Sequence, residues 1–280
     1  MNKNIATFPL TEAFRADDEC PFCNLERSAE QHAISFILGS AYMEDDIRAA
    51  TDAQGFCRQH YKMMYDYGNR LGSAWILSTH MKKLNEELTK ELKDFTTGKS
   101  SMFGRMKKTD MSGDKSPQTS IGAWIKKKTG SCYVCDHFRE IYGRYLDVFF
   151  DMLKKDPEFQ ELFRQSKGFC LPHFADLIEA AESRLSDAQK KELYPQIFEM
   201  MQSNMERVQK DVAWFVEKND YRNKDKDWGE SRDSIQRAMQ KCAGGYPATK
   251  IILYILLRSR SADSSIPSIR QRRSLEEQQL

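Results

Sequence analysis

The chain has 280 residues, of which 40% are hydrophobic and 30% are charged. These fractions exclude a disordered or membrane-spanning chain and are typical of a soluble globular protein. The net charge of +2, from 43 Lys+Arg against 41 Asp+Glu, gives no overall attraction to nucleic acid or to an anionic membrane. Glycine (14) and proline (8) are scarce, which favours helices over strands. At about 100–200 residues per domain, the length allows two domains.

The N-terminal segment contains no apolar run of signal-peptide length. The longest apolar run, 251–257, is far shorter than the ~20 residues that a membrane-spanning helix needs. We therefore expect a cytoplasmic protein without a transmembrane segment. In that reducing compartment the seven cysteines should ligate metal, take part in redox chemistry or be buried, rather than form structural disulfides.

Six of the seven cysteines belong to a pattern that occurs twice along the chain. Each copy is a C-x-x-C element followed, at nearly the same distance, by a G-F-C-x-x-H element. The first copy supplies Cys20, Cys23, Cys57 and His60, and the second supplies Cys132, Cys135, Cys170 and His173. An internal repeat of this kind predicts two similar units.

The chemistry of zinc accounts for this pattern. Zn²⁺ binds four sulfur and nitrogen ligands in a tetrahedron, and a Cys and a His three positions apart lie on one face of a helical turn. We therefore expect each unit to hold one zinc ion with its own three cysteines and one histidine. Four protein ligands leave no position for water or substrate, which indicates a structural role. An iron–sulfur cluster, a metal-free redox pair and simple burial of the cysteines are the alternatives.

Hydrophobic spacing and helix-breaking residues predict helices along most of the chain, and hence an all-α fold. In the first half they fall at 24–38, 42–50, 57–67 and 71–95. In the second half they fall at 133–155, from 157 onward, at 171–183, 195–218 and 232–242. Asp156 is the expected N-cap before Pro157, and Ser186 with Gln189 resembles a capping box.

The predicted organisation has four parts. They are a metal-binding unit at 1–95, a flexible basic linker at 96–130, a second metal-binding unit at 131–243 and a partly disordered tail at 244–280. The linker is rich in Ser, Thr, Gly and Pro. Its basic flanks could contact nucleic acid, and a solvated, self-repelling linker is the alternative. The residues of these flanks are Arg105, Lys107 and Lys108, and then Lys126, Lys127 and Lys128.

Two further groups are weaker candidates for a binding surface. The first is the acidic helix start Glu44, Asp45 and Asp46 with Arg48, which could bind a cation or a basic partner, or support a metal-bound histidine. Acids at the positive end of a helix dipole would equally explain it. The second is Tyr221, Arg222 and Trp228. The chain has no dinucleotide fingerprint, P-loop or nucleophile elbow, so we assign no catalytic residue and no nucleotide cofactor.

Several segments together resemble an uncharacterised bacterial family, domain-of-unknown-function family 6062. They are Cys20–Cys23, Ser40–Arg48, Gly55–Met64, Cys132–Asp136, Ser166–Cys170 and Asp220–Asn223. The resemblance spans residues 1–243 and implies a cytosolic helical protein with paired Cys/His clusters. It implies no activity, so no residue role is carried over from it.

The function that these observations favour is a zinc-binding helical scaffold or regulatory module that recognises a protein partner, without enzymatic activity. One alternative is a metalloenzyme or a thiol-based redox or zinc sensor, in which the thiolate of Cys57 or Cys170 would be released by oxidation. Another is nucleic-acid binding through the basic linker, which would weaken steeply with salt.

Overall fold

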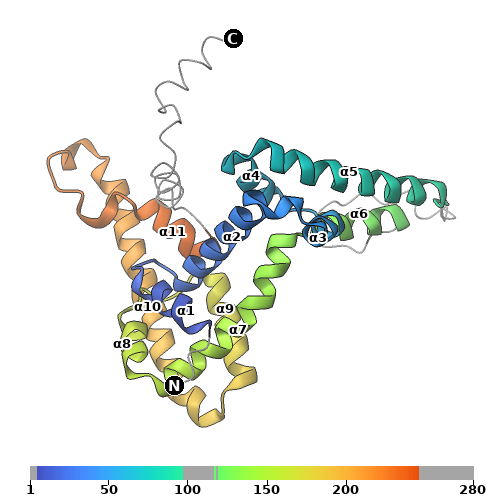
Figure 1. The fold of residues 1–280 in the computed structure, drawn as a ribbon. Coiled ribbons are helices and arrows are strands. Elements are labelled where there is room, and N and C mark those ends of the chain that lie inside the picture. The colour runs from blue at the N-terminus through green and yellow to red at the C-terminus, as the bar shows by residue number, and fades with distance from the viewer. Residues whose placement is uncertain (1–4, 97–116, 118, 246–280) are drawn as a thin grey trace, which may run out of the picture.

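A computed structural model describes residues 5–96, 117 and 119–245 of the chain (Figure 1). Within these residues every regular element is a helix, which confirms the all-α fold class. None of the helices in this part of the chain is long and apolar enough to cross a membrane. The apolar run at 251–257 and most of the tail lie outside the described residues.

The first half folds into five α-helices and one short 3₁₀ helix. They are α1 (Thr7–Arg15), α2 (Pro21–Gly39), η1 (Ala41–Met43), α3 (Asp45–Gln54), α4 (Arg58–Tyr67) and α5 (Arg70–Lys93). Helix α1 was not predicted from the sequence, because its buried residues Leu10, Ala13 and Phe14 are surrounded by polar ones. The acidic helix begins later than predicted, since η1 occupies the first residues of that segment.

The second half continues with α6 (Ser120–Gly130), α7 (Tyr133–Lys155), α8 (Pro157–Gln165), α9 (Leu171–Arg184), α10 (Asp187–Lys218), η3 (Tyr221–Asn223), η4 (Gly229–Ser231) and α11 (Ser234–Ala243). The predicted N-cap at Asp156 and the capping box at Ser186 are both formed. Because that capping box starts the helix, α10 begins at Asp187 and contains Pro195 within it rather than at its start.

Residues 120–130, which were predicted to lie in the flexible linker, form α6 instead. This helix packs beside α5 (Figure 1). Glu87 on α5 holds it, because its carboxylate accepts a hydrogen bond from Trp124 at 3.2 Å and pairs with Lys128 at 2.6 Å. Lys128, one of the linker lysines proposed to contact nucleic acid, is therefore paired within the protein. Arg105, Lys107 and Lys108 lie outside the described residues.

Two hydrophobic cores hold the helices together, and each draws residues from both halves of the chain. The larger core packs α1 and the start of α2 against α7, α8, α9 and α10. Its centre is Phe149, whose ring lies 5.8 Å from that of Phe14 and 5.6 Å from that of Phe22. Ring pairs at these separations add to the stabilisation from buried apolar area.

The smaller core packs the end of α2 with α4 and α5 against the start of α7. The helices α2 and α7 therefore run through both cores, side by side and in opposite directions, while α5 and α6 extend away from them (Figure 1). This antiparallel packing determines which of the cysteine and histidine motifs meet.

Candidate metal sites

The eight predicted ligands form two groups in which the ligand atoms lie within 4.8 Å of one another. The core site consists of Cys20, Cys23, Cys170 and His173. The edge site consists of Cys57, His60, Cys132 and Cys135. The predicted pairing within each half of the chain is therefore wrong: each site joins the C-x-x-C of one copy to the C-x-x-H of the other. The physical reason is the antiparallel packing of α2 and α7, which puts the starts of the two helices at opposite ends of the pair, each beside a C-x-x-H helix of the opposite half.

Each site lies where the N-termini of two helices meet. Cys20 is the N-cap of α2 and Cys170 that of α9, which brings two helix starts to the core site. Cys57 is the N-cap of α4 and Cys132 that of α7, at the edge site. The positive ends of the helix dipoles favour thiolates at these positions.

The G-F-C element has a local structural reason. Gly55 and Gly168 have φ values of +64° and +77°, a region that glycine enters without steric cost. The phenylalanine that follows each glycine, Phe56 or Phe169, is buried and anchors the turn. The next residue is the cysteine that starts the helix, so the turn and the anchor together direct that sulfur into its site.

In the core site one ring nitrogen of His173 faces all three sulfurs. Its Nδ1 lies 3.5 Å from the Sγ of Cys20, 3.4 Å from that of Cys23 and 3.2 Å from that of Cys170. The sulfurs of Cys23 and Cys170 are 3.6 Å apart. The four ligand atoms therefore point to a common centre.

The edge site repeats this arrangement. The Nδ1 of His60 lies 3.1 Å from the Sγ of Cys57, 3.3 Å from that of Cys132 and 3.4 Å from that of Cys135. The sulfurs of Cys57 and Cys135 are 3.9 Å apart. The exposure of the two sites differs, because Cys57 and Cys135 are only partly buried whereas the core ligands are all buried.

These distances fit a tetrahedral metal ion. Bonds of about 2.3 Å to sulfur and 2.0–2.1 Å to nitrogen give edges of roughly 3.8 Å between sulfurs and roughly 3.5 Å between sulfur and nitrogen. The observed sulfur–sulfur edges are 3.6 and 3.9 Å, and the observed sulfur–nitrogen edges run from 3.1 to 3.5 Å, at or somewhat below the ideal value. Each group can therefore hold one metal ion with its four ligand atoms.

The ligands of each site also shift one another's pKa values. Burial alone would lower the pKa of His173 and of His60, but hydrogen bonds with neighbouring thiol groups, and with Glu30 at His60, raise each pKa to about 10. Burial would raise the pKa of the Cys132 thiol, but His60 lowers that pKa to about 6. Burial would also raise the pKa of the Cys20 thiol in the core site, but hydrogen bonds with Cys170, Cys23 and His173 lower that pKa well below its ordinary value. A metal ion must therefore displace protons from a thiolate–imidazolium pair in each site.

Two carboxylates that were not predicted from the sequence lie behind the histidines. Glu30 on α2 accepts a hydrogen bond from the Nε2 of His60 at 3.0 Å, and Gln59 also donates to that carboxylate. Glu26, one turn earlier, has a carboxylate oxygen 3.8 Å from the Nε2 of His173. A carboxylate in this position holds the ring orientation and tautomer of a metal-binding histidine. The sequence does contain a signal for these two carboxylates, since Glu26 and Glu30 follow Cys23 at the spacing of one helix face.

The acidic group proposed as a possible support for a metal-bound histidine makes local contacts instead. Asp46 accepts a hydrogen bond from the backbone N–H of Ile47, and Arg48 pairs with Asp45 at the start of α3. The Arg48 guanidinium also lies 5.9 Å from the centre of the Trp75 ring. Glu44 is the N-cap of α3 and is exposed.

The second weak candidate lies at the far end of α10. Trp228 packs its ring 5.5 Å from that of Phe215, with the ammonium of Lys218 5.1 Å from the Trp228 ring centre. Arg222 pairs with Asp220 at 2.7 Å, and Tyr221 is exposed. Trp228 thus has a packing role in the structure. Tyr221, Arg222 and Trp228 are not part of either metal site.

The fold and the two sites define an all-α protein with two Cys₃His groups, each able to bind a metal ion and each built from both halves of the chain. The chain belongs to a family of unknown function, DUF6062, whose model matches residues 1–249. This confirms the resemblance noted in the sequence.

A curated relative is similar to this chain over 214 residues, with 23% identity, covering 76% of this chain and 88% of the relative. It is an uncharacterized 23.9 kDa protein in the xynA 3′ region of Caldicellulosiruptor sp. (strain Rt8B.4). No solved structure matches the chain.

Proposed function

We propose that the protein is a helical scaffold whose two halves are joined by two structural zinc ions. The observation that carries this proposal is the cross-pairing of the motifs, which makes each ion a link between segments far apart in sequence. Cys23 and Cys170, for example, are separated by 147 positions and meet in one site. Binding free energy at such a site adds to folding free energy, on the order of 10 kcal/mol per zinc in small peptides.

Zinc is the metal that suits this donor set. Three thiolates and one imidazole in a tetrahedron are typical of structural zinc sites, and soft sulfur ligands disfavour magnesium, calcium and manganese. Four protein ligands complete the preferred coordination of zinc, which supports a structural rather than a catalytic role. All seven cysteines are free thiols, which supports placing the protein in a reducing compartment such as the cytoplasm.

Elemental analysis of the purified protein, with its visible absorbance, tests this proposal. We expect two zinc ions per chain, no iron absorbance, and a large fall in the unfolding temperature when a chelator removes the ions. A protein that contains iron, or that keeps its unfolding temperature after complete metal removal, would contradict the proposal.

We also propose that the scaffold binds a helix of a partner protein along α5. Leu77, Met81 and Leu92 are 38%, 50% and 58% exposed, and they fall on one face of this extended helix. An apolar stripe at this spacing is the surface that a second amphipathic helix covers. A photo-cross-linking residue placed at Met81 in cells should form one defined adduct, whereas the same residue at Lys90, on another face of α5, should not. Equal cross-linking at both positions, or none at Met81, would contradict this proposal.

A further inference from the structure

We propose that the edge site is an oxidation-sensitive metal centre, in which hydrogen peroxide converts Cys57 and Cys135 into a disulfide and releases the edge zinc while the core zinc is retained. This inference rests on the proposed zinc occupancy of the two sites. It adds a modification site and a division of roles between the two ions.

The two sites differ in burial. In the core site Cys20, Cys23 and Cys170 are all 0% exposed. In the edge site Cys132 is 2% exposed, but Cys57 and Cys135 are only partly buried. Susceptibility to oxidation follows thiolate character and solvent access. Two of the six ligand sulfurs can therefore be reached by a small oxidant, and both belong to the edge site.

The core site is also covered by backbone. Helix α11 ends beside it, at Gly244, where an added Cβ would lie 3.3 Å from the Sγ of Cys170 and 3.9 Å from that of Cys23. The backbone of this segment therefore closes directly over the core sulfurs. Gly244 has a φ of +74°, so this close approach also requires a glycine conformation.

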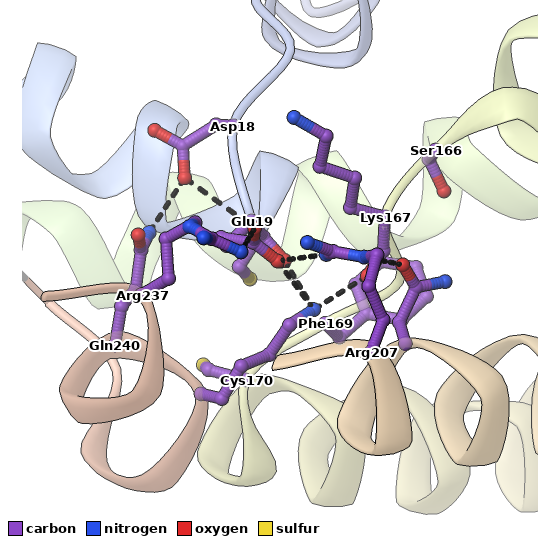
Figure 2. A network of polar contacts seen from close by, with 12 residues as sticks. Asp18, Glu19, Ser166, Lys167, Phe169, Cys170, Arg207, Arg237 and Gln240 are labelled. Atoms are coloured by element: carbon purple, nitrogen blue, oxygen red, sulfur yellow. Dashed lines mark hydrogen bonds and ion pairs between the residues drawn. The ribbon is translucent and has the colours of Figure 1, made fainter. Parts of the chain in front are cut away.

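Buried charges hold that cover in place. Lys241 on α11 is 1% exposed and donates hydrogen bonds to the backbone oxygens of Glu19 and Lys167. The Glu19 carboxylate, one position before Cys20, pairs with Arg207 at 2.6 Å and with Lys241 at 3.3 Å. Figure 2 shows this network, in which Gln240 also reaches Asp18. The network ties α10 and α11 to the segment that carries the first core ligands.

The two accessible sulfurs of the edge site lie close enough to be joined. The sulfurs of Cys57 and Cys135 lie 3.9 Å apart, on the starts of two different helices. The S–S bond of a disulfide is about 2.05 Å long, so roughly 2 Å of side-chain movement would bring the two sulfurs into bonding distance. The other two edge ligands, Cys132 and His60, are buried and do not compete for the oxidant.

The reaction balances with peroxide as the oxidant. The Cys57 thiolate attacks one peroxide oxygen, the O–O bond breaks, and one proton from solvent gives a sulfenic acid and a water molecule. The Cys135 thiolate then attacks the sulfenic sulfur and forms the S–S bond, and a second proton from solvent releases the oxygen as another water. The two thiolates supply the two electrons that reduce the peroxide. Zinc keeps its charge and leaves, because only Cys132 and His60 remain to bind it.

The disulfide would still join α4 to α7, as the metal does. We therefore expect the oxidised protein to stay folded while it loses one ion, and a dithiol reductant with added zinc to restore the site. This combination distinguishes a reversible switch from general oxidative damage.

The experiment uses the full chain with two bound zinc ions and a Cys242→Ser background, because Cys242 is an exposed free thiol. Peroxide is added, released zinc is followed with a chromophoric chelator, and disulfides are identified by peptide mapping. We expect one zinc equivalent to be released, with a Cys57–Cys135 bridge in the products. Release of neither ion, release of both at the same rate, or a bridge that includes Cys20 or Cys170 would overturn the inference.

The motif-equivalent variants Cys57→Ser and Cys170→Ser provide matched controls. The first should retain only the core zinc and release none to peroxide, and the second should retain only the edge zinc and release it at the unsubstituted rate. Even if a variant folds poorly, the peptide map of the protein without these two substitutions shows whether the Cys57–Cys135 disulfide forms. A chain without zinc would refute the proposed function, whereas two zinc ions that both resist peroxide would refute only this inference.

Discussion

The carboxylate of Glu30 lies 3.0 Å from the Nε2 of His60, while the Nδ1 of the same ring faces the three sulfurs of the edge site. Helix α2 thus supplies two cysteines to the core site and a supporting carboxylate to the edge site. The hydrogen bond selects the tautomer that leaves Nδ1 free to bind metal. This one helix therefore couples the geometry of both sites.

The first prediction concerns this carboxylate. Glu30→Gln removes the charge behind His60 and should weaken metal binding at the edge site by about 10- to 100-fold. The core site should keep its affinity. Glu26→Gln should have a smaller effect on the core site, because Glu26 lies 3.8 Å from His173 and makes a weaker contact. Competition against a chromophoric chelator measures both affinities, and an equal loss at the two sites would contradict the assigned role of Glu30.

The second prediction tests the cover over the core site. Lys241→Ala removes two hydrogen bonds from a charged donor, which contribute about 1.5–3 kcal/mol each. Loss of both bonds should make local opening of α11 roughly 10²- to 10⁴-fold more frequent, and a chelator should take the core ion correspondingly faster. Lys210→Ala, at an exposed position of α10, is the matched control. Unchanged release from the Lys241 variant would show that α11 does not limit access.

The third prediction concerns pH. His60 and His173 have pKa values raised to about 10 in the metal-free protein, and the pKa values of the Cys23 and Cys135 thiols are also raised. All four groups are therefore protonated at neutral pH and must lose their protons when metal binds. Loading should release at least two protons per site, so affinity should fall about 100-fold or more per pH unit as the pH decreases.

Calorimetric titration in buffers of different ionisation enthalpy counts the released protons. Fewer than one proton per site at neutral pH would contradict these protonation states. Below pH 6 the Cys132 thiolate, whose pKa is about 6, should add a further proton at the edge site.

The fourth prediction separates core packing from metal binding. Phe149 is 0% exposed and its ring lies within 6.4 Å of six other aromatic rings. Phe149→Ala should cost about 3–5 kcal/mol of unfolding free energy, through lost burial and the cavity left behind. Phe36→Ala, at a position that is 58% exposed, should cost about 0.5 kcal/mol or less. Urea unfolding of the metal-loaded protein measures both, and both variants should keep two metal ions.

The sequence predicted which residues are metal ligands, but it did not predict which of them share a site. Hydrophobic spacing and capping residues act within a few positions, so they identified α4, α7, α8 and α9 and the capping box at Ser186. The C-x-x-C and C-x-x-H spacings are local in the same way, and all eight ligands fall in the two sites. Which pair of motifs shares an ion depends on the antiparallel packing of α2 against α7, and no local pattern encodes that packing.

Other features were missed for a similar reason. The roles of Glu30, Lys241 and Gly244 depend on contacts with segments distant in sequence. Helix α1 is short, and its hydrophobic pattern is weak because it buries only three residues. Those residues pack into the larger core, which the second half of the chain mainly forms, so the reason for the helix lies far away in sequence. Residues 120–130 were predicted as linker because they adjoin the stretch rich in Ser, Thr, Gly and Pro and carry three successive lysines, although Glu87 on α5 holds this helix through two side chains.

The most direct test compares two double variants that each remove two ligand sulfurs. Cys20→Ser with Cys170→Ser removes two of the three sulfurs of the core site and should leave one tightly bound zinc ion per chain, held at the edge site. Cys20→Ser with Cys57→Ser removes one sulfur from each site and should leave no ion that survives a competing chelator. If instead the second variant keeps one ion and the first keeps none, the ligands pair within each half of the chain and the cross-paired arrangement is wrong.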